Sequence, residues 1–256
     1  METAAITACA ALVERGDPDR FLAAMAAPVA ARGALFTLAA FNLELARIPW
    51  VTRETVLAQM RLQFWRDVVA GEDPAPHEVA GPLRALLAGT DLTPAPLLAM
   101  IDAREVELGT SRPFADTEAL WRYLSGTGGA LMVAMVQALG GAGDASGHDA
   151  AEAIGTAQGL ANYLAAVPAL TAAGRHPLPD QTAAAVADLA AEGLRRFDQA
   201  RRRRPALPRA ALLGAWRTRS LLAQALAGPG AVLTSGLPQS EFRRRGSLLW
   251  RALTGP

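Results

Sequence analysis

Residues 29–70 read VAARGALFTLAAFNLELARIPWVTRETVLAQMRLQFWRDVVA, and this stretch decides the fold class. Its apolar residues recur near helical spacing, and Pro49 is predicted to end a helix over residues 29–47, because proline cannot donate the next backbone hydrogen bond. Thr52 is predicted to cap a second helix over residues 53–70. The stretch therefore predicts two consecutive helices with a short break between them.

The rest of the chain repeats this pattern of helical spacing, caps and breakers. Alanine accounts for 57 of the 256 residues, which favours helix over strand, and no segment reads as a convincing strand. Asp19 is predicted to cap a short helix that Pro28 interrupts. Gly71 is predicted to end the helix over residues 53–70, Asp116 to cap a later helix, and Pro168 to close another. We therefore expect an all-α protein of about nine helices. Those after residue 70 are expected at about 78–87, 95–108, 116–139, 149–167, 181–203, 207–226 and 239–253.

Length and composition exclude several classes of protein. The 256 residues are 51% hydrophobic and carry a formal net charge of +1, which fits a folded protein with a real core. No linker divides the chain, so residues 1–256 are predicted to form a single domain. Cys9 is the only cysteine and lysine is absent, which excludes an intrachain disulfide, a Schiff-base lysine and a P-loop lysine. The three histidines show no metal-ligand spacing.

Charge is divided unevenly along the chain. Residues 1–173 hold 11 arginines and 19 acidic residues, whereas residues 174–256 hold 14 arginines and 5 acidic residues. The basic excess concentrates in residues 195–219 and 243–251. One interpretation is a surface for an anionic membrane or an acidic protein; the other is a set of solvated helix ends. Nucleic acid is not expected, because no aromatic residues or binding motif accompany the arginines.

The apolar runs are short. The apolar runs at residues 21–31 and 130–142 hold 11 and 13 residues, which is too few to span a bilayer. No basic region precedes the apolar stretch near the N-terminus, so a cleaved secretory signal is not expected. We therefore expect a cytoplasmic protein, peripheral on the inner face of the membrane if the basic segments bind lipid.

Two segments carry polar groups that could do chemistry. Asp102, Glu105 and Glu107 surround Arg104; such carboxylates can bind Mg²⁺, although an exposed helical face with an internal ion pair is the more common explanation. Residues 61–66, RLQFWR, place two arginines, a glutamine and a tryptophan within two helical turns. This segment predicts either a polar pocket lining with an Arg–Trp stack or a salt-bridged helix whose aromatic residues pack in the core.

A family resemblance rests on several segments taken in order. These are AFNLELARI at residues 40–48, RLQFWR, WRYLSGTGGA at 121–130, and GTAQGLANYL at 155–164 followed by GRHPLP at 174–179. Their order and spacing resemble the squalene/phytoene synthase family over residues 19–219, which leaves residues 220–256 as a C-terminal basic helix. The resemblance implies one all-α isoprenoid-synthase domain with helices around a central cavity.

The same resemblance bears on catalysis. Enzymes of this family join two prenyl diphosphates and hold Mg²⁺ on two aspartate-rich motifs, because the departing diphosphate needs its charge neutralised. This chain has other residues where those aspartates would be: Ala46, Arg47, Trp50, Ala166 and Leu170. These side chains do not bind Mg²⁺, so we expect no metal, no cofactor and no catalytic residue.

The resemblance is nearer to a side branch of the family that includes an assembly factor for mitochondrial respiratory complex I. It implies a non-catalytic accessory protein that helps to build NADH–quinone oxidoreductase, with a subunit of that complex as a partner. The alternatives are an active prenyltransferase, in which Arg61, Arg66 and Arg175 would hold the diphosphate, and an isoprenoid-binding protein. If a pocket survives, its expected polar lining is Asn42, Glu44, Arg61, Gln63, Trp65, Arg66, Tyr123, Asn162 and Arg175.

Overall fold

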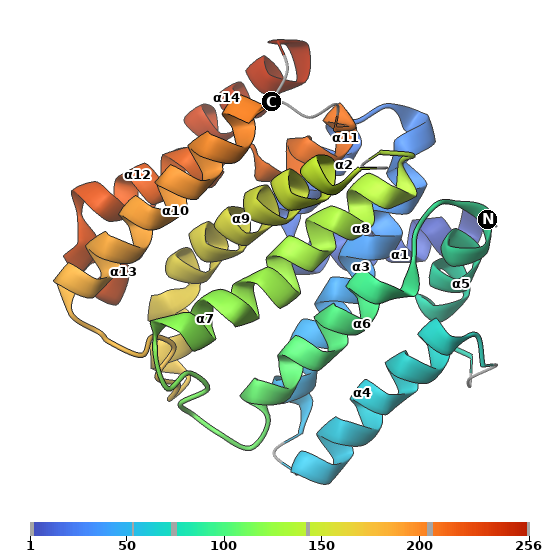
Figure 1. The fold of residues 1–256 in the computed structure, drawn as a ribbon, viewed down its shortest axis with the longest axis horizontal. Coiled ribbons are helices and arrows are strands. Elements are labelled where there is room, and N and C mark those ends of the chain that lie inside the picture. Colours follow the sequence, from blue (N-terminus) through green and yellow to red (C-terminus); the bar gives the residue numbers. More distant parts are fainter. Residues whose placement is uncertain (1–2, 53, 73–75, 142–143, 204–206, 255–256) are drawn as a thin grey trace.

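The chain folds as a bundle of helices (Figure 1). The computed structural model describes residues 3–52, 54–72, 76–141, 144–203 and 207–254. Within these ranges there are fourteen α-helices, three short 3₁₀ or π segments and no strand, so the all-α prediction is confirmed. The number of helices exceeds the expected nine, because several long predicted helices are divided and two short ones were missed.

The N-terminal part is built on a long central helix. Helices α1 (Thr3–Gly16) and α2 (Pro18–Ala26) pack on α3 (Val29–Val51). The cap of α2 is Asp17 and not Asp19, since the Asp17 carboxylate accepts the Arg20 N–H at 3.0 Å. The predicted stop at Pro49 is wrong: α3 continues through it to Val51. A proline this close to a helix end removes one hydrogen bond of the last turns and leaves the rest intact.

The next helices lie beside α3. They are α4 (Thr55–Ala70), α5 (Ala80–Gly89), α6 (Pro94–Ala103) and the 3₁₀ segment η1 (Arg104–Glu107). Helix α4 ends at Gly71, whose φ of 90° suits glycine, as the sequence predicts. Thr52 does not cap α4; its hydroxyl accepts the Glu54 N–H at 3.1 Å in the turn before the helix. The predicted start at residue 53 lies outside the described residues.

The middle of the chain forms a rod that crosses a second long helix. Helices α7 (Thr117–Leu124) and α8 (Ala130–Ala138) are joined by the π segment η2 (Ser125–Gly129), and α9 (Ala145–Ala172) packs across them. The predicted cap is confirmed, because Asp116 accepts the Ala119 N–H at 2.7 Å. A Cβ on Gly128 would lie 2.6 Å from the carbonyl oxygen of Gly155, so these glycines permit the close crossing.

Helix α9 differs from the prediction at both ends. It begins after Asp144, whose carboxylate accepts the Gly147 N–H at 2.6 Å, and it continues through Pro168. The C-terminal elements wrap one side of α9 (Figure 1). They are α10 (Ala183–Arg203), α11 (Arg209–Leu212), the 3₁₀ segment η3 (Leu213–Ala215), α12 (Thr218–Ala227), α13 (Pro229–Thr234) and α14 (Glu241–Thr254).

Helix α3 is the center of the core. Its Phe41 ring meets the Trp65 ring of α4 edge-on, with the centroids 5.2 Å apart, and both side chains are buried. Among the described helices, α3 is the one that is long and apolar enough to cross a membrane by length and composition. In this fold, 56% of that apolar window is buried inside the protein. The helix therefore serves here as a packed core element.

Candidate functional site

A surface cleft lies where α3 and α9 end. We call it the Trp50 cleft; its volume is about 460 Å³. The ends of the two helices that match the family's aspartate motifs meet here, together with the loop after η1. The lining residues are Pro49, Trp50, Thr52, Gly109, Thr110, Ser111, Ala173, Gly174 and Arg175.

Arg175 holds the cleft together. One of its terminal nitrogens donates to the carbonyl oxygens of Thr110 at 2.7 Å and Glu107 at 3.2 Å, and the other donates to that of Pro49 at 3.1 Å. The guanidinium carbon also lies 4.8 Å from the center of the Trp50 ring. The Arg175 guanidinium therefore joins three segments that are far apart in sequence, and it does so through backbone acceptors.

A buried polar cluster lies next to this loop. Arg104 donates to the Glu107 carboxylate at 3.0 Å and to the Tyr123 hydroxyl at 2.6 Å, and Tyr123 donates to Glu107 at 2.9 Å. Burial raises the pKa of Tyr123 well above its usual range, so its hydroxyl stays protonated at neutral pH. The Arg104 Nε is buried and has no hydrogen-bond partner. We call Arg104, Glu107 and Tyr123 the buried triad.

The acidic cluster around Arg104 is divided in the structure. Glu107 is half-buried beside the buried Arg104, whereas Asp102 and Glu105 are exposed and bind Arg66 at 2.7 and 2.6 Å. The prediction of one shared exposed face is therefore wrong for the Arg104–Glu107 pair. In the described ranges, no group of three or more His, Cys, Asp or Glu side chains is arranged to hold a metal ion.

The α4 segment is mainly structural. Trp65 is buried between Phe41 and Phe64, and its ring also meets His77 at 4.9 Å. Arg61 is exposed to solvent while Trp65 lies in the core, so the two side chains do not form the expected stack. Hydrogen bonds from Asp102, and then from Glu105, raise the pKa of Arg66. Of the two interpretations of this segment, the salt-bridged core helix is confirmed.

The remaining predicted lining residues lie apart from one another. Asn42 is half-buried on α3 and Asn162 is exposed on α9. Glu44 binds Arg47 at 3.3 Å and approaches His77 at 3.8 Å, and Gln63 donates to Asp67 at 2.6 Å. The predicted set therefore does not converge on one pocket.

Within the predicted set, two residues prove central to this region. Arg175 organises the cleft and Tyr123 belongs to the buried triad. Sequence reasoning missed Arg104 and Glu107 as the partners of Tyr123. The i, i+3 spacing of these two charges was the available signal.

The motif-matching positions cluster at the ends of the two long helices. Arg47 is 58% exposed and pairs with Glu44, and Trp50 is 49% exposed above Arg175. Ala46, Ala166 and Leu170 are partly buried. The side chains at these positions are therefore hydrophobic or cationic, and of the five, Trp50 lines the Trp50 cleft.

Comparison with known sequences supplies a family and named relatives. The profile of the Squalene/phytoene synthase family matches residues 13–248. The chain is 31% identical over 163 residues to NADH dehydrogenase (ubiquinone) complex I, assembly factor 6, of Bos taurus and of Homo sapiens, covering 62% of this chain and 48% of each relative. The Drosophila melanogaster homolog is 29% identical over 184 residues, covering 67% and 52%. The chain thus spans about half the length of these curated relatives.

Solved structures share the fold. A dehydrosqualene synthase in complex with a ligand superposes with a TM-score of 0.77 at 14% identity, covering 96% of this chain and 95% of that one. Squalene synthase HpnC from Alicyclobacillus acidocaldarius superposes with a TM-score of 0.70 at 18% identity, covering 90% and 95%. These likenesses concern the fold alone. Together with the family profile, they establish that the chain belongs to the squalene/phytoene synthase family.

Proposed function

We propose that the chain is a non-catalytic member of its family that assists the assembly of respiratory NADH–quinone oxidoreductase. The observation that carries this proposal is the set of residues at the positions that match the family's aspartates. There the ends of α3 and α9 present alanine, leucine, tryptophan and arginine, and of these residues Trp50 lines the Trp50 cleft. The names of the curated relatives support the assembly role.

The chemistry of the cleft supports the loss of catalysis. Ionisation of a prenyl diphosphate releases a multiply charged anion, whose charge the family neutralises with Mg²⁺ bound to carboxylate oxygens. The Arg47 guanidinium would repel such a metal ion. Arg175 already donates to three carbonyl oxygens, and Arg66 is bound to two carboxylates on another face. The arginines suggested for metal-free diphosphate binding do not converge on one site.

The proposal includes the place of action and the partner. The partner is a subunit of the respiratory complex, and the chain works on the inner face of the membrane as a peripheral protein without a cofactor. The fold would then serve as a scaffold for binding a partner. The hydrogen bonds of the buried triad and those of Arg175 would keep the scaffold rigid.

The experiment has two arms. Purified chain is incubated with labelled farnesyl or geranylgeranyl diphosphate and either Mg²⁺ or Mn²⁺, with an active synthase as positive control; we expect no diphosphate release. In parallel, the gene is deleted from its host and membrane NADH–quinone oxidoreductase activity is measured; we expect a loss that the wild-type gene restores. A condensed C30 or C40 product from this chain would overturn the non-catalytic proposal, and unchanged oxidoreductase activity would overturn the assembly role.

The size of the Trp50 cleft favours one alternative, binding of an isoprenoid without turnover. Its volume of about 460 Å³ leaves room for a small ligand, and Trp50 supplies an aromatic wall beside a lining that includes threonine, serine and arginine. Organic extraction of the purified chain and mass spectrometry would test this function. A stoichiometric prenyl compound that is lost in Trp50→Ser would support it, and a lipid-free chain would exclude it.

A further inference from the structure

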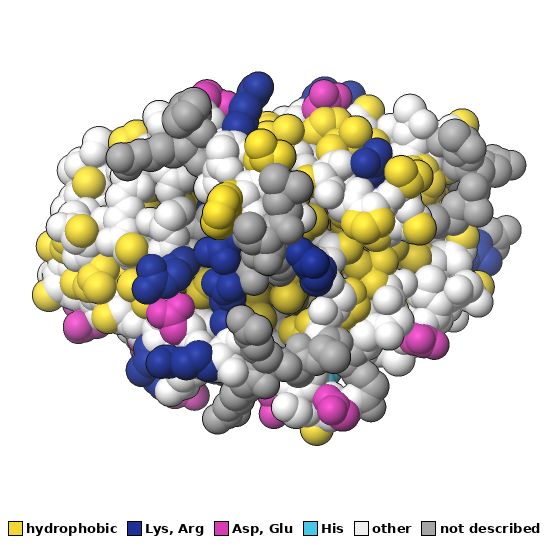
Figure 2. Space-filling model, turned by 90° about the horizontal axis from the view of Figure 1, so that it is seen from above, with side chains coloured by type: hydrophobic (Ala, Val, Ile, Leu, Met, Phe, Trp, Pro, Cys, Tyr) yellow, Lys and Arg dark blue, Asp and Glu magenta, His cyan; other side chains and the backbone are white. Residues whose placement is uncertain are grey.

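The sequence around α10, α12 and α14 is rich in arginine. Residues 195–219 contain nine arginines and one acidic residue, and residues 243–251 contain four arginines and no acidic residue. Figure 2 shows dark blue side chains gathered beside hydrophobic ones on the face seen from above. We call this surface the arginine face; among the described residues, its members are Arg201, Arg202, Arg219, Arg245, Leu249, Trp250 and Arg251.

The arginine face contains an apolar hollow with a cationic rim. Helices α9, α10, α12 and α14 contribute to it together with η3. The apolar wall consists of Ile154, Phe197, Leu212, Ala215 and Trp216, and the rim consists of Arg201, Arg219 and Arg251. The Asp198 carboxylate lies 3.3 Å from Arg219, and the Arg201 guanidinium lies 5.6 Å from the center of the Phe197 ring. A cationic rim of this kind attracts anionic groups at the surface.

Large hydrophobic side chains project from the same face. Leu249 is 63% exposed and Trp250 is 67% exposed on α14, while the preceding Leu248 is buried against the bundle. Tryptophan favours the boundary between lipid headgroups and acyl chains. Stable peripheral binding usually needs both an apolar and an electrostatic contribution, and this face supplies both.

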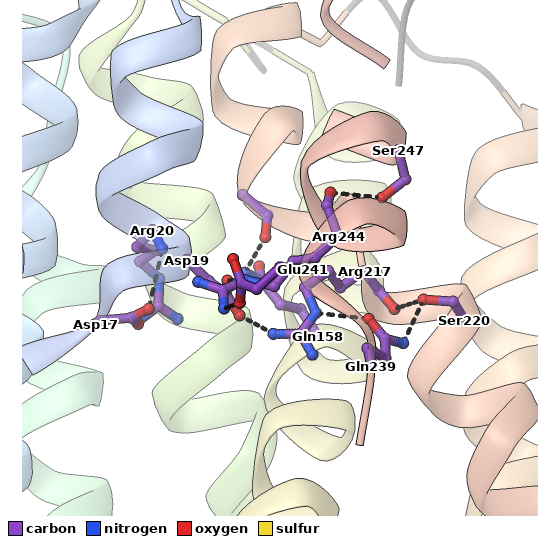
Figure 3. A network of polar contacts seen from close by, with 11 residues as sticks. Asp17, Asp19, Arg20, Gln158, Arg217, Ser220, Gln239, Glu241, Arg244 and Ser247 are labelled. Atoms are coloured by element: carbon purple, nitrogen blue, oxygen red, sulfur yellow. Dashed lines mark hydrogen bonds and ion pairs between the residues drawn. The ribbon is translucent and has the colours of Figure 1, made fainter. Parts of the chain in front are cut away.

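Helix α14 is held in a fixed orientation by a shared carboxylate. Asp19 of α2 accepts a hydrogen bond from Arg244 at 2.6 Å and another from Arg217, and Arg217 also donates to Gln239 at 3.0 Å (Figure 3). We call Asp19, Arg217 and Arg244 the Asp19 latch. Its charges are paired within the protein, and Glu241 at the start of α14 also pairs with Arg244 and with the exposed Arg245.

We propose that the arginine face docks the chain onto an anionic phospholipid bilayer. Phosphate groups would lie between the guanidiniums of Arg201, Arg219 and Arg251, and Leu249 and Trp250 would enter the interfacial layer. The inference rests on the proposed function, because it names the surface with which the assembly factor reaches the membrane. Its test measures lipid binding alone and involves no oxidoreductase, so the two proposals fail separately.

A second exposed apolar region lacks this charge pattern and therefore makes a useful control. It lies at the start of α4, where Val56 is 66% and Met60 is 63% exposed. Its nearest arginine in sequence, Arg61, is accompanied by Glu54 at the helix start. Apolar exposure is therefore common to both regions. In sequence the control region has two arginines, Arg53 and Arg61, against Glu54, which is a smaller cationic excess than that of residues 195–219.

The experiment is vesicle co-sedimentation of the full chain. One set of vesicles is phosphatidylcholine alone and the other contains about 30% phosphatidylglycerol, each in about 0.05 M and about 0.5 M NaCl. The test variants are Arg219→Gln/Arg251→Gln and Leu249→Ser/Trp250→Ser. The matched controls are Arg112→Gln/Arg122→Gln, which removes two exposed arginines outside the face, and Val56→Ser/Met60→Ser.

We expect wild type to bind the anionic vesicles and not the neutral ones, with weaker binding at the higher salt concentration. The Arg219/Arg251 variant should lose about thirtyfold in partition coefficient, since each arginine contributes about fivefold at an anionic surface. The Leu249/Trp250 variant should lose about tenfold at either salt concentration. Equal losses in the matched controls, or binding to a duplex oligonucleotide with none to vesicles, would overturn the proposal.

Discussion

Two regions along α9 use arginine in different ways. At its C-terminal end, Arg175 and Arg104 donate to carbonyl, carboxylate and hydroxyl oxygens and fasten the loop after η1. About 27 Å back along the helix, near Ile154, the side chains of Arg201, Arg219 and Arg251 line a surface hollow, and Arg219 forms an exposed ion pair with Asp198. The contrast is between arginines that join buried segments of the chain and arginines that contribute to the surface potential.

The largest effect should come from breaking the buried triad. Arg104→Met leaves the Glu107 carboxylate buried without its cationic partner, and removing one member of a buried pair costs about 3–5 kcal/mol. We expect the free energy of unfolding, measured by urea denaturation with circular dichroism, to fall by about that amount. The control is Arg104→Met/Glu107→Gln, which should recover most of the loss because no unpaired charge remains. A loss below about 1 kcal/mol in the single variant would show that the triad does not stabilise this end.

Arg175→Gln is expected to have a smaller effect on stability. Three backbone carbonyl oxygens lose their donor, which should lower the free energy of unfolding by about 1–3 kcal/mol. Trp50 loses its stacking partner as well, so acrylamide should quench its fluorescence more strongly, with Trp50→Phe used to subtract the other tryptophans. Arg112→Gln, an exposed neighbour, serves as the control and should behave as wild type. Unchanged quenching in Arg175→Gln would contradict the role assigned to this residue.

The arginine face should respond weakly to the same type of change. Arg202→Gln/Arg219→Gln removes two exposed charges, one of them in an exposed pair with Asp198, so stability should change by no more than about 0.5 kcal/mol in either direction. Wild type should become more stable as NaCl rises, because salt screens the excess of positive charge, and the variant should show a smaller salt dependence. If Arg202→Gln/Arg219→Gln lowered stability as much as Arg175→Gln does, the distinction between structural arginines and surface arginines would be wrong.

The smallest effect concerns Glu192 on α10. Hydrogen bonds from Arg195, and then from Arg196, lower the pKa of the Glu192 carboxyl to about 2. The unfolded carboxyl titrates near its ordinary pKa, so the unfolded chain binds the proton first as pH falls. The stabilisation is therefore complete above about pH 4.5 and is lost as pH falls towards 2.

Because Glu192 is partly solvated, its contribution should be about 0.5 kcal/mol after screening. Thermal melts between pH 5 and 2 should fall less steeply for Glu192→Gln than for wild type. Superimposable pH profiles would show that this pair has no measurable effect on stability.

Much of the fold could be predicted from the sequence because it depends on local signals. Helical spacing, the Asp116 cap and the left-handed Gly71 are properties of short segments, and each is confirmed. The errors at Pro49 and Pro168 have a common cause. Both prolines lie in the last turns of long packed helices, where the burial of the helix outweighs one lost hydrogen bond.

The candidate site was less accessible to sequence reasoning, and η1 shows why. An α-helix over residues 95–108 would place Asp102, Glu105 and Glu107 around one surface. The structure tightens to three residues per turn at Arg104, so Arg104 and Glu107 stand one above the other and turn inward. A change of helix type over four residues thus decides which charges turn inward, and it depends on contacts with α3 and with Tyr123 of α7.

The Asp19 latch has a consequence for the order of folding. Asp19 meets Arg217 and Arg244 across separations of 198 and 225 residues, which are among the longest contacts that the described chain forms. Contacts that close such long loops form late, and the last helix also leaves the ribosome last. The bundle should therefore be complete before α14 docks. On this schedule, a nascent chain acquires its membrane-facing surface only once the rest of the molecule has already taken shape.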